Sequence, residues 1–185
     1  MLSRARAHAS ENRGLLQESR ITFDNIDFDM LTTFPDPRTA PWWDGRPFES
    51  WRVEIGEYLR TDLNRRGTFS DWMAPWLLPS VIEEADWFSL WTKEISRDEV
   101  PLAWLRWAFG WVQATRKTSA GTPVDNQIAT YLPECQVFVT SDRVFAQCVE
   151  KVRPNAPVEL GRAAQVPAGA DAIDAVLEVM RDLAE

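Results

Sequence analysis

The sequence predicts an α/β domain in which many helices surround a small parallel sheet. Apolar residues recur at helical spacing through the middle of the chain, as in Trp104, Trp107 and Trp111. One short apolar run, Val137–Val139, instead has the β-branched and aromatic content of a buried strand. Because few strands stand among many helices, we expect a small sheet covered by helices. The chain of 185 residues is long enough to form one domain with its own core.

The N-terminal half is predicted to consist of helices joined by loops. Helices are expected over 2–18, 49–64, 80–94 and 101–116, and a short extended segment near 20–23. A proline-rich loop at 34–48 follows the extended segment, and a loop with Trp72 and Trp76 precedes the third helix. Pro101 favours the start of the fourth helix, because the first position of a helix does not use its N–H group.

The C-terminal half alternates between helix and strand. We expect a helix at 124–132, a strand at 136–140, a helix at 142–152, a short strand around 157–160, and a terminal helix starting in Ala168–Asp171. The apolar stripe of that last helix consists of Ile173, Val176, Leu177 and Met180. The chain is thus predicted to be a single domain over 1–185. Its tryptophan-rich helical region at 40–116 precedes a half at 117–160 that carries the candidate site, and a C-terminal helix at 168–185.

Tryptophan is unusually frequent in this chain. All ten tryptophans lie between Trp42 and Trp111. The helical spacing of Trp104, Trp107 and Trp111 predicts core packing, whereas a stacking platform for bases needs exposed rings beside cationic groups. Trp42 and Trp43 differ because they lie in the proline-rich loop. They could expose a binding surface for RNA or a partner protein, or fold down as a lid over the core.

Composition excludes several classes of function. The formal net charge of −8 argues against binding nucleic acid through a basic surface. No apolar run approaches the roughly 20 residues that span a bilayer, and no apolar stretch follows the first arginines, so we expect a cytoplasmic protein without membrane contact. Cys135 and Cys148 are predicted to be reduced core residues. His8 is the single histidine, which argues against a histidine-based triad or zinc site.

Two aspartates begin predicted helices of the C-terminal half. Asp125 follows the turn-forming Pro123, and Asp142 follows the strand that ends at Thr140. Ligands of open α/β sheets bind at the carboxyl ends of the strands, so both carboxylates could face one mouth. Mg²⁺ and Mn²⁺ prefer such oxygen ligands, and the Thr140 hydroxyl could orient a water there. Taken singly, each aspartate is better explained as a helix cap, and only the pair in its shared context favours a cation site.

Two basic residues precede this region. Arg116 and Lys117 lie at the end of a predicted helix, just before the loop that contains Asp125. They could guide a phosphate backbone towards that aspartate. Cations at a helix C-terminus are also favoured by the helix dipole alone, so both interpretations stay open.

The segments TPVDNQIATYL and VFVTSDRVF together resemble the C-terminal half of PIN-like nucleases, a family of metal-dependent ribonucleases. The resemblance extends from Gly121 to near Pro154. It implies a three-layer fold around a small parallel sheet, and an endoribonuclease that cleaves RNA with Mg²⁺ or Mn²⁺. Asp125 and Asp142 match the acidic positions of the family, which would make them metal ligands, with Thr140 beside them. The resemblance also implies an RNA substrate and either an antitoxin-like protein partner or a homodimer.

The N-terminal half departs from the pattern of that family. PIN-like domains open on a strand that ends in an aspartate, whereas this chain opens on a predicted helix. Asp24 is the best internal candidate for a third catalytic acid, although an exposed edge strand or a docked loop explains its surroundings equally well. Alternatively, the chain is the C-terminal part of a longer nuclease, or a truncated or degenerate module that binds RNA or a protein without catalysis. A further alternative is a small helical interaction protein whose aspartates only cap helices.

Overall fold

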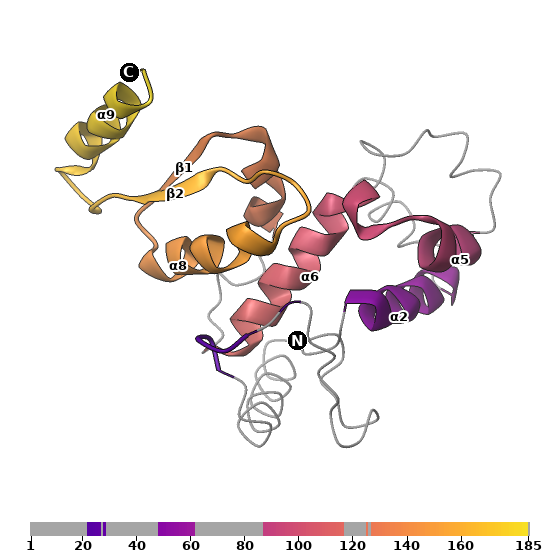
Figure 1. Ribbon diagram of the computed structural model, residues 1–185. Helices are drawn as coiled ribbons and strands as arrows, with labels where there is room; N and C mark the ends of the chain where they lie inside the picture. Colours follow the sequence, from indigo (N-terminus) through magenta and orange to yellow (C-terminus); the bar gives the residue numbers. More distant parts are fainter. Residues whose placement is uncertain are drawn as a thin grey trace.

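The structure is a computed structural model of the chain. Helices dominate its described part, in which two short strands form a sheet (Figure 1). The structure describes residues 22–26, 28, 48–61, 87–116, 125 and 127–184. The elements are α2 (Phe48–Thr61), α5 (Trp87–Ser89), the π-helix η2 (Leu90–Glu94), η3 (Arg97–Glu99), α6 (Pro101–Ala114), η4 (Ala129–Glu134), β1 (Val137–Thr140), α8 (Arg143–Val152), η5 (Arg153–Asn155), β2 (Arg162–Gln165) and α9 (Ala172–Asp182). This composition confirms the predicted α/β class at the level of a mostly helical structure with a small parallel sheet.

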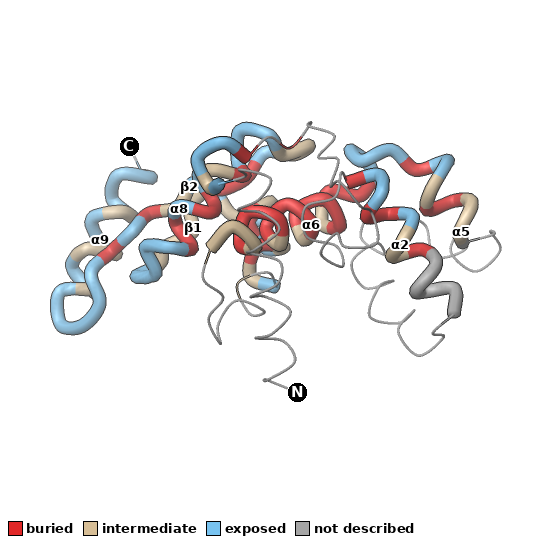
Figure 2. The backbone as a smooth tube through the Cα atoms, turned by 90° about the horizontal axis from the view of Figure 1, so that it is seen from below, coloured by how far each residue is buried: buried red, intermediate tan, exposed pale blue. Residues whose placement is uncertain are grey.

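Helix α6 is the centre of the core. It begins at Pro101, as predicted, and is buried along nearly its whole length (Figure 2). Trp104, Trp107 and Trp111 are at most 3 % exposed, so their helical spacing does reflect core packing. The ring of Phe28 lies 5.7 Å from that of Trp104, so Phe28 from the N-terminal part of the chain packs against this helix. Such aromatic pairs add stability beyond the area that they bury.

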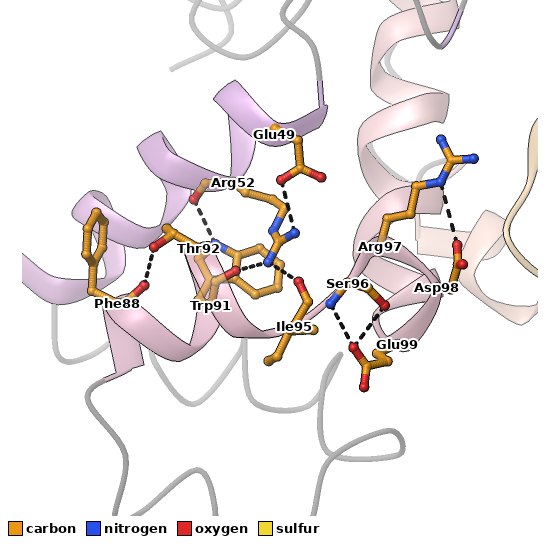
Figure 3. A network of polar contacts seen from close by, with 10 residues as sticks. All are labelled: Glu49, Arg52, Phe88, Trp91, Thr92, Ile95, Ser96, Arg97, Asp98 and Glu99. Atoms are coloured by element: carbon orange, nitrogen blue, oxygen red, sulfur yellow. Dashed lines mark hydrogen bonds and ion pairs between the residues drawn. The ribbon is translucent and has the colours of Figure 1, made fainter.

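A buried arginine joins α2 to the π-helix η2 (Figure 3). Arg52 is 3 % exposed and donates hydrogen bonds to the backbone oxygens of Trp91 and Ile95. Its guanidinium also lies 5.1 Å from the Trp91 ring, and the indole N–H of Trp91 donates to the Arg52 carbonyl over 2.7 Å. Burial lowers the pKa of Arg52, and Glu49 opposes that shift. These contacts supply buried donors to two carbonyls at and just after the π-helix.

The sheet belongs to a β1–α8–β2 unit. The two strands are parallel, with Val137 opposite Arg162 and Thr140 opposite Gln165. Parallel strands need a crossover connection, and α8 supplies it while packing on one face of the sheet. The ring of Phe138 meets that of Phe145 edge-on at 5.4 Å, so this strand residue faces α8. The strand predicted at 136–140 and the helix predicted at 142–152 are therefore confirmed within one residue.

The second strand lies later than predicted. We expected it around 157–160, but it spans Arg162–Gln165. Leu160 packs instead into the hydrophobic core, at 4 % exposure. The chain then passes so close to Cys135 that a Cβ at Gly161 would lie 2.5 Å from the Cys135 carbonyl oxygen. Val158 and Leu160 thus take part in core packing, and pairing with β1 makes the alanine-containing segment after them the strand β2.

Other boundaries also shift from their predicted positions. The extended segment near 20–23 is wrong at its described end, because Phe23–Asn25 form a turn in which the Asn25 side chain accepts hydrogen bonds from Thr22. The helix at 124–132 is helical from Asp125 but tightens into the 3₁₀-helix η4. The terminal helix begins at Ala172, after Gly169 adopts a φ of 97°, a conformation favourable only to glycine.

Several predictions fall outside the described residues. These are the helix at 2–18, most of the loop at 34–48, the position of Trp42, Trp43, Trp72 and Trp76, and that of His8. Within the described ranges, no helix is both long enough and apolar enough to cross a membrane.

Candidate functional site

Asp142 begins α8, as predicted, and acts as its cap. One carboxylate oxygen, Oδ1, accepts hydrogen bonds from the amides of Val144 at 2.7 Å and Phe145 at 3.0 Å. The Asp142 amide in turn donates to the Thr140 hydroxyl over 3.0 Å. This local geometry follows from the sequence, because an aspartate between a strand and a helix satisfies amides that the first helical turn leaves free. Among the described residues, Oδ2 of Asp142 has no hydrogen bond.

Asp125 lies in the helical segment that continues into η4. Ala129 and Leu132 of η4 are fully buried, and η4 packs on α6, which fixes this segment against the core. Partial burial raises the pKa of Asp125, and the negative charge of Asp142 raises it further. The fold therefore brings together two like charges that lie on different elements, separated in the sequence by η4 and β1.

Cys148 of α8 lies close to both acids. Its thiol is buried and free, as predicted, and Cys135 is also free. Burial raises the pKa of Cys148 to about 11, Arg116 opposes the shift, and Asp125 and Asp142 add to it. The thiol is consequently protonated at neutral pH, which argues against a nucleophilic role. Its three charged neighbours show that Arg116 shares this neighbourhood with the acids.

Arg116 follows the C-terminal end of α6. Its Nη2 donates to the Gln147 side chain over 3.0 Å, and its guanidinium stacks on the Phe23 ring, with Cζ 3.7 Å from the ring centroid. The Nε atom is buried and has no hydrogen-bond partner in the described part of the chain. The guanidinium is thus held in place by a ring and an amide rather than by a carboxylate. Lys117, the other predicted guiding residue, falls outside the described residues.

Asp24 lies in the turn that contacts Arg116 through Phe23. Its side chain is exposed in the turn at Phe23–Asn25, and its carbonyl accepts a hydrogen bond from Lys151 Nζ at 2.9 Å. Lys151 is about 13.5 Å further along α8 than Asp142, at 1.5 Å per residue. Phe23 of the same turn contacts Arg116, but no described contact joins the Asp24 side chain to Asp125 or Asp142. No group of three or more His, Cys, Asp or Glu side chains that could hold a metal ion occurs among the residues described.

The sequence singles out both acids but does not indicate the contact of Gln147 with Arg116 or the position of Cys148 near the acids. Gln147 and Cys148 lie on α8 at positions that its sequence pattern assigns only to a helix. Nothing local in the sequence indicates that Gln147 meets Arg116, because that contact depends on the packing of α8 on α6. The sequence shows where the two acids lie along the chain, but the position of Arg116 beside them depends on tertiary structure.

Comparison with known proteins adds no relative to this picture. No protein-family model, curated protein or solved structure matches the chain. The resemblance to PIN-like nucleases rests on the two sequence segments that contain Asp125 and Asp142.

Proposed function

We propose that the chain is a PIN-like, Mg²⁺- or Mn²⁺-dependent endoribonuclease whose cation is held by Asp125 and Asp142. One observation supports this most strongly. The charge of Asp142 raises the pKa of Asp125, so two carboxylates from separate elements are held within electrostatic reach of each other. Because the two carboxylates repel each other, it is unfavourable for both to be ionised at once. A divalent cation bound between them would remove this repulsion.

The donor set fits a hard cation. Two carboxylates leave the remaining positions of a Mg²⁺ ion to waters and substrate phosphate, which is the usual arrangement for this ion. When bound, such an ion supplies a Lewis acid and an activated water for phosphodiester hydrolysis. The chain has two carboxylate oxygens of Asp125 and the Oδ2 atom of Asp142 to offer, since Oδ1 of Asp142 caps α8.

Neighbouring residues have roles in the proposed reaction. The Thr140 hydroxyl accepts a hydrogen bond from the amide of Asp142. Its own proton can be donated to a water or a phosphate oxygen. Arg116 supplies a positive charge beside the acids, and its fixed guanidinium suits a phosphate of the RNA backbone. Asp24 is given no role, because no described contact links its exposed side chain to Asp125 or Asp142.

Cleavage of a mixed RNA pool tests this proposal. The purified chain should cut RNA with Mn²⁺, and EDTA should stop the reaction. Asp142→Asn should abolish cutting while leaving the fold intact, because asparagine caps a helix about as well as aspartate. Asp98→Asn is a matched control, since Asp98 is an exposed acid on a different element. Equal cutting by Asp142→Asn and the parent chain would exclude the proposed site.

A second candidate function is binding without catalysis, to RNA or to a protein partner such as an antitoxin-like chain. It is favoured by the cap bonds of Asp142 and by the lack of a third acid near the pair within the described ranges. In that case the chain should bind RNA or a partner equally well in EDTA, and neither aspartate variant should change the affinity.

A further inference from the structure

The C-terminal helix α9 stands apart from the rest of the structure. In both views it extends from one end of the molecule, beyond the sheet (Figures 1 and 2). None of its residues is buried. It nevertheless carries large apolar side chains, with Ile173 71 %, Leu177 46 % and Met180 60 % exposed, followed by Leu183 at 44 %. The helix therefore has an apolar face that the described fold leaves uncovered. The other large apolar residues exposed within the described ranges, Val53, Tyr131 and Val144, lie on separate elements.

The exposed residues form one continuous stripe. Ile173, Leu177 and Met180 are spaced i, i+4 and i+7, which places them on one side of a helix. Asp174 and Arg181 are also seven residues apart, so they lie together along one edge of the stripe. Asp171, Glu178 and Asp182 occupy the opposite, solvent-facing side.

The pattern is nearly symmetric about Leu177. Asp174 precedes this residue by three positions, and Arg181 follows it by four. Ile173 and Met180 likewise flank it at four positions and three. A second copy of α9 laid antiparallel, with the two Leu177 side chains near the centre, therefore brings Asp174 of each copy opposite Arg181 of the other. The same register sets apolar residues against apolar residues along the whole stripe.

We propose that α9 pairs with α9 of a second copy of this chain, in an antiparallel and two-fold symmetric helix pair. The interface is self-complementary, as a two-fold axis requires, because two Asp174–Arg181 ion pairs lie along one edge of the apolar seam. An anionic membrane surface is a poorer occupant, since four acids and one arginine make the polar side of α9 acidic. Two short helices bury a small area, so the pairing is weak and depends on concentration.

Sedimentation equilibrium of the full chain, from low micromolar to submillimolar concentration, measures this pairing. The parent chain should reach twice the monomer mass, and Leu177→Asp should stay monomeric. Glu178→Gln, on the solvent-facing side of the same helix, is the matched control and should dimerise like the parent. A parent chain that stays monomeric throughout, or a Leu177→Asp variant that still dimerises, would overturn the proposal.

Charge reversal tests the antiparallel register. Asp174→Arg alone places arginine at both edge positions, and Arg181→Asp alone places aspartate at both, so each variant should dimerise more weakly than the parent. An equimolar mixture of the two variants should recover association as a heterodimer, because each arginine then meets an aspartate. Recovery on mixing cannot come from altered helix stability, since both variants keep their own substitutions. Failure of the mixture to recover would contradict the proposed register.

Discussion

Charged groups have opposite effects on stability in the tryptophan-rich half of the molecule and in the β1–α8–β2 half. In the first, the guanidinium of Arg52 is buried and bound by two backbone carbonyls. In the second, two aspartates on different elements are held so that the charge of one disfavours ionisation of the other. The first arrangement stabilises the fold, and the second costs stability. A fold retains an unfavourable pair of charges most readily where a ligand can relieve it.

The largest expected effect lies in the core of the tryptophan-rich half. Trp104→Ala should lower the free energy of unfolding by about 3–5 kcal/mol, because it leaves a large cavity beside Phe28 and Trp107. Urea denaturation followed by circular dichroism measures the change. Trp104→Phe should cost much less, because the indole N–H that it removes is buried without a hydrogen-bond partner in the described structure. Equal losses for both variants would show that the indole itself is required.

The next effect concerns the buried arginine. Arg52→Met should destabilise the chain by about 2–3 kcal/mol, because the carbonyls of Trp91 and Ile95 lose their donor. Glu49→Gln is the control, since Glu49 is largely exposed and its ion pair with Arg52 contributes little. Thermal unfolding of both variants separates the two contributions. A stable Arg52→Met variant would mean that the desolvation cost of the guanidinium outweighs its hydrogen bonds.

A smaller effect separates the two roles of Asp142. Asp142→Ala should lower the free energy of unfolding by about 1 kcal/mol, because the amides of Val144 and Phe145 lose their acceptor. Asp142→Asn retains an acceptor and should change stability little. Comparing the melting temperatures of the two variants without metal therefore isolates the cap. If Asp142→Asn were as unstable as Asp142→Ala, the charge rather than the hydrogen bonds would hold the helix start.

The smallest effect is a stabilisation, and it depends on pH. The pKa of Asp125 is raised in the folded chain, so ionisation of this group opposes folding once the pH exceeds its unfolded pKa. The cost grows as the pH rises through the acidic range and is complete at neutral pH. Asp125→Asn should therefore melt slightly higher than the parent at neutral pH without metal, and no higher at acidic pH. A melting temperature below that of the parent at neutral pH would contradict this sign.

Local sequence patterns predicted the parts of the fold that local chemistry decides. Pro101 marks the start of α6, and Asp142 caps α8, because both residues act on the backbone next to them. The position of β2 was wrong because its pairing with β1, and not its own composition, makes Arg162–Gln165 a strand. Arg116 could be suspected of acting near Asp125, but its contacts with Phe23 and Gln147 depend on packing between distant segments.

A thermal-unfolding titration with Mn²⁺ tests most directly whether Asp125 and Asp142 bind one divalent cation. A ligand that binds only the folded chain adds about 2.7 kcal/mol of stability at a hundredfold excess over its dissociation constant. The parent chain and Asp98→Asn should therefore melt at higher temperature as Mn²⁺ increases, while Asp125→Asn and Asp142→Asn should lose most of this response. If the two site variants respond to Mn²⁺ as the parent does, or if the parent does not respond, the acid pair is not a cation site.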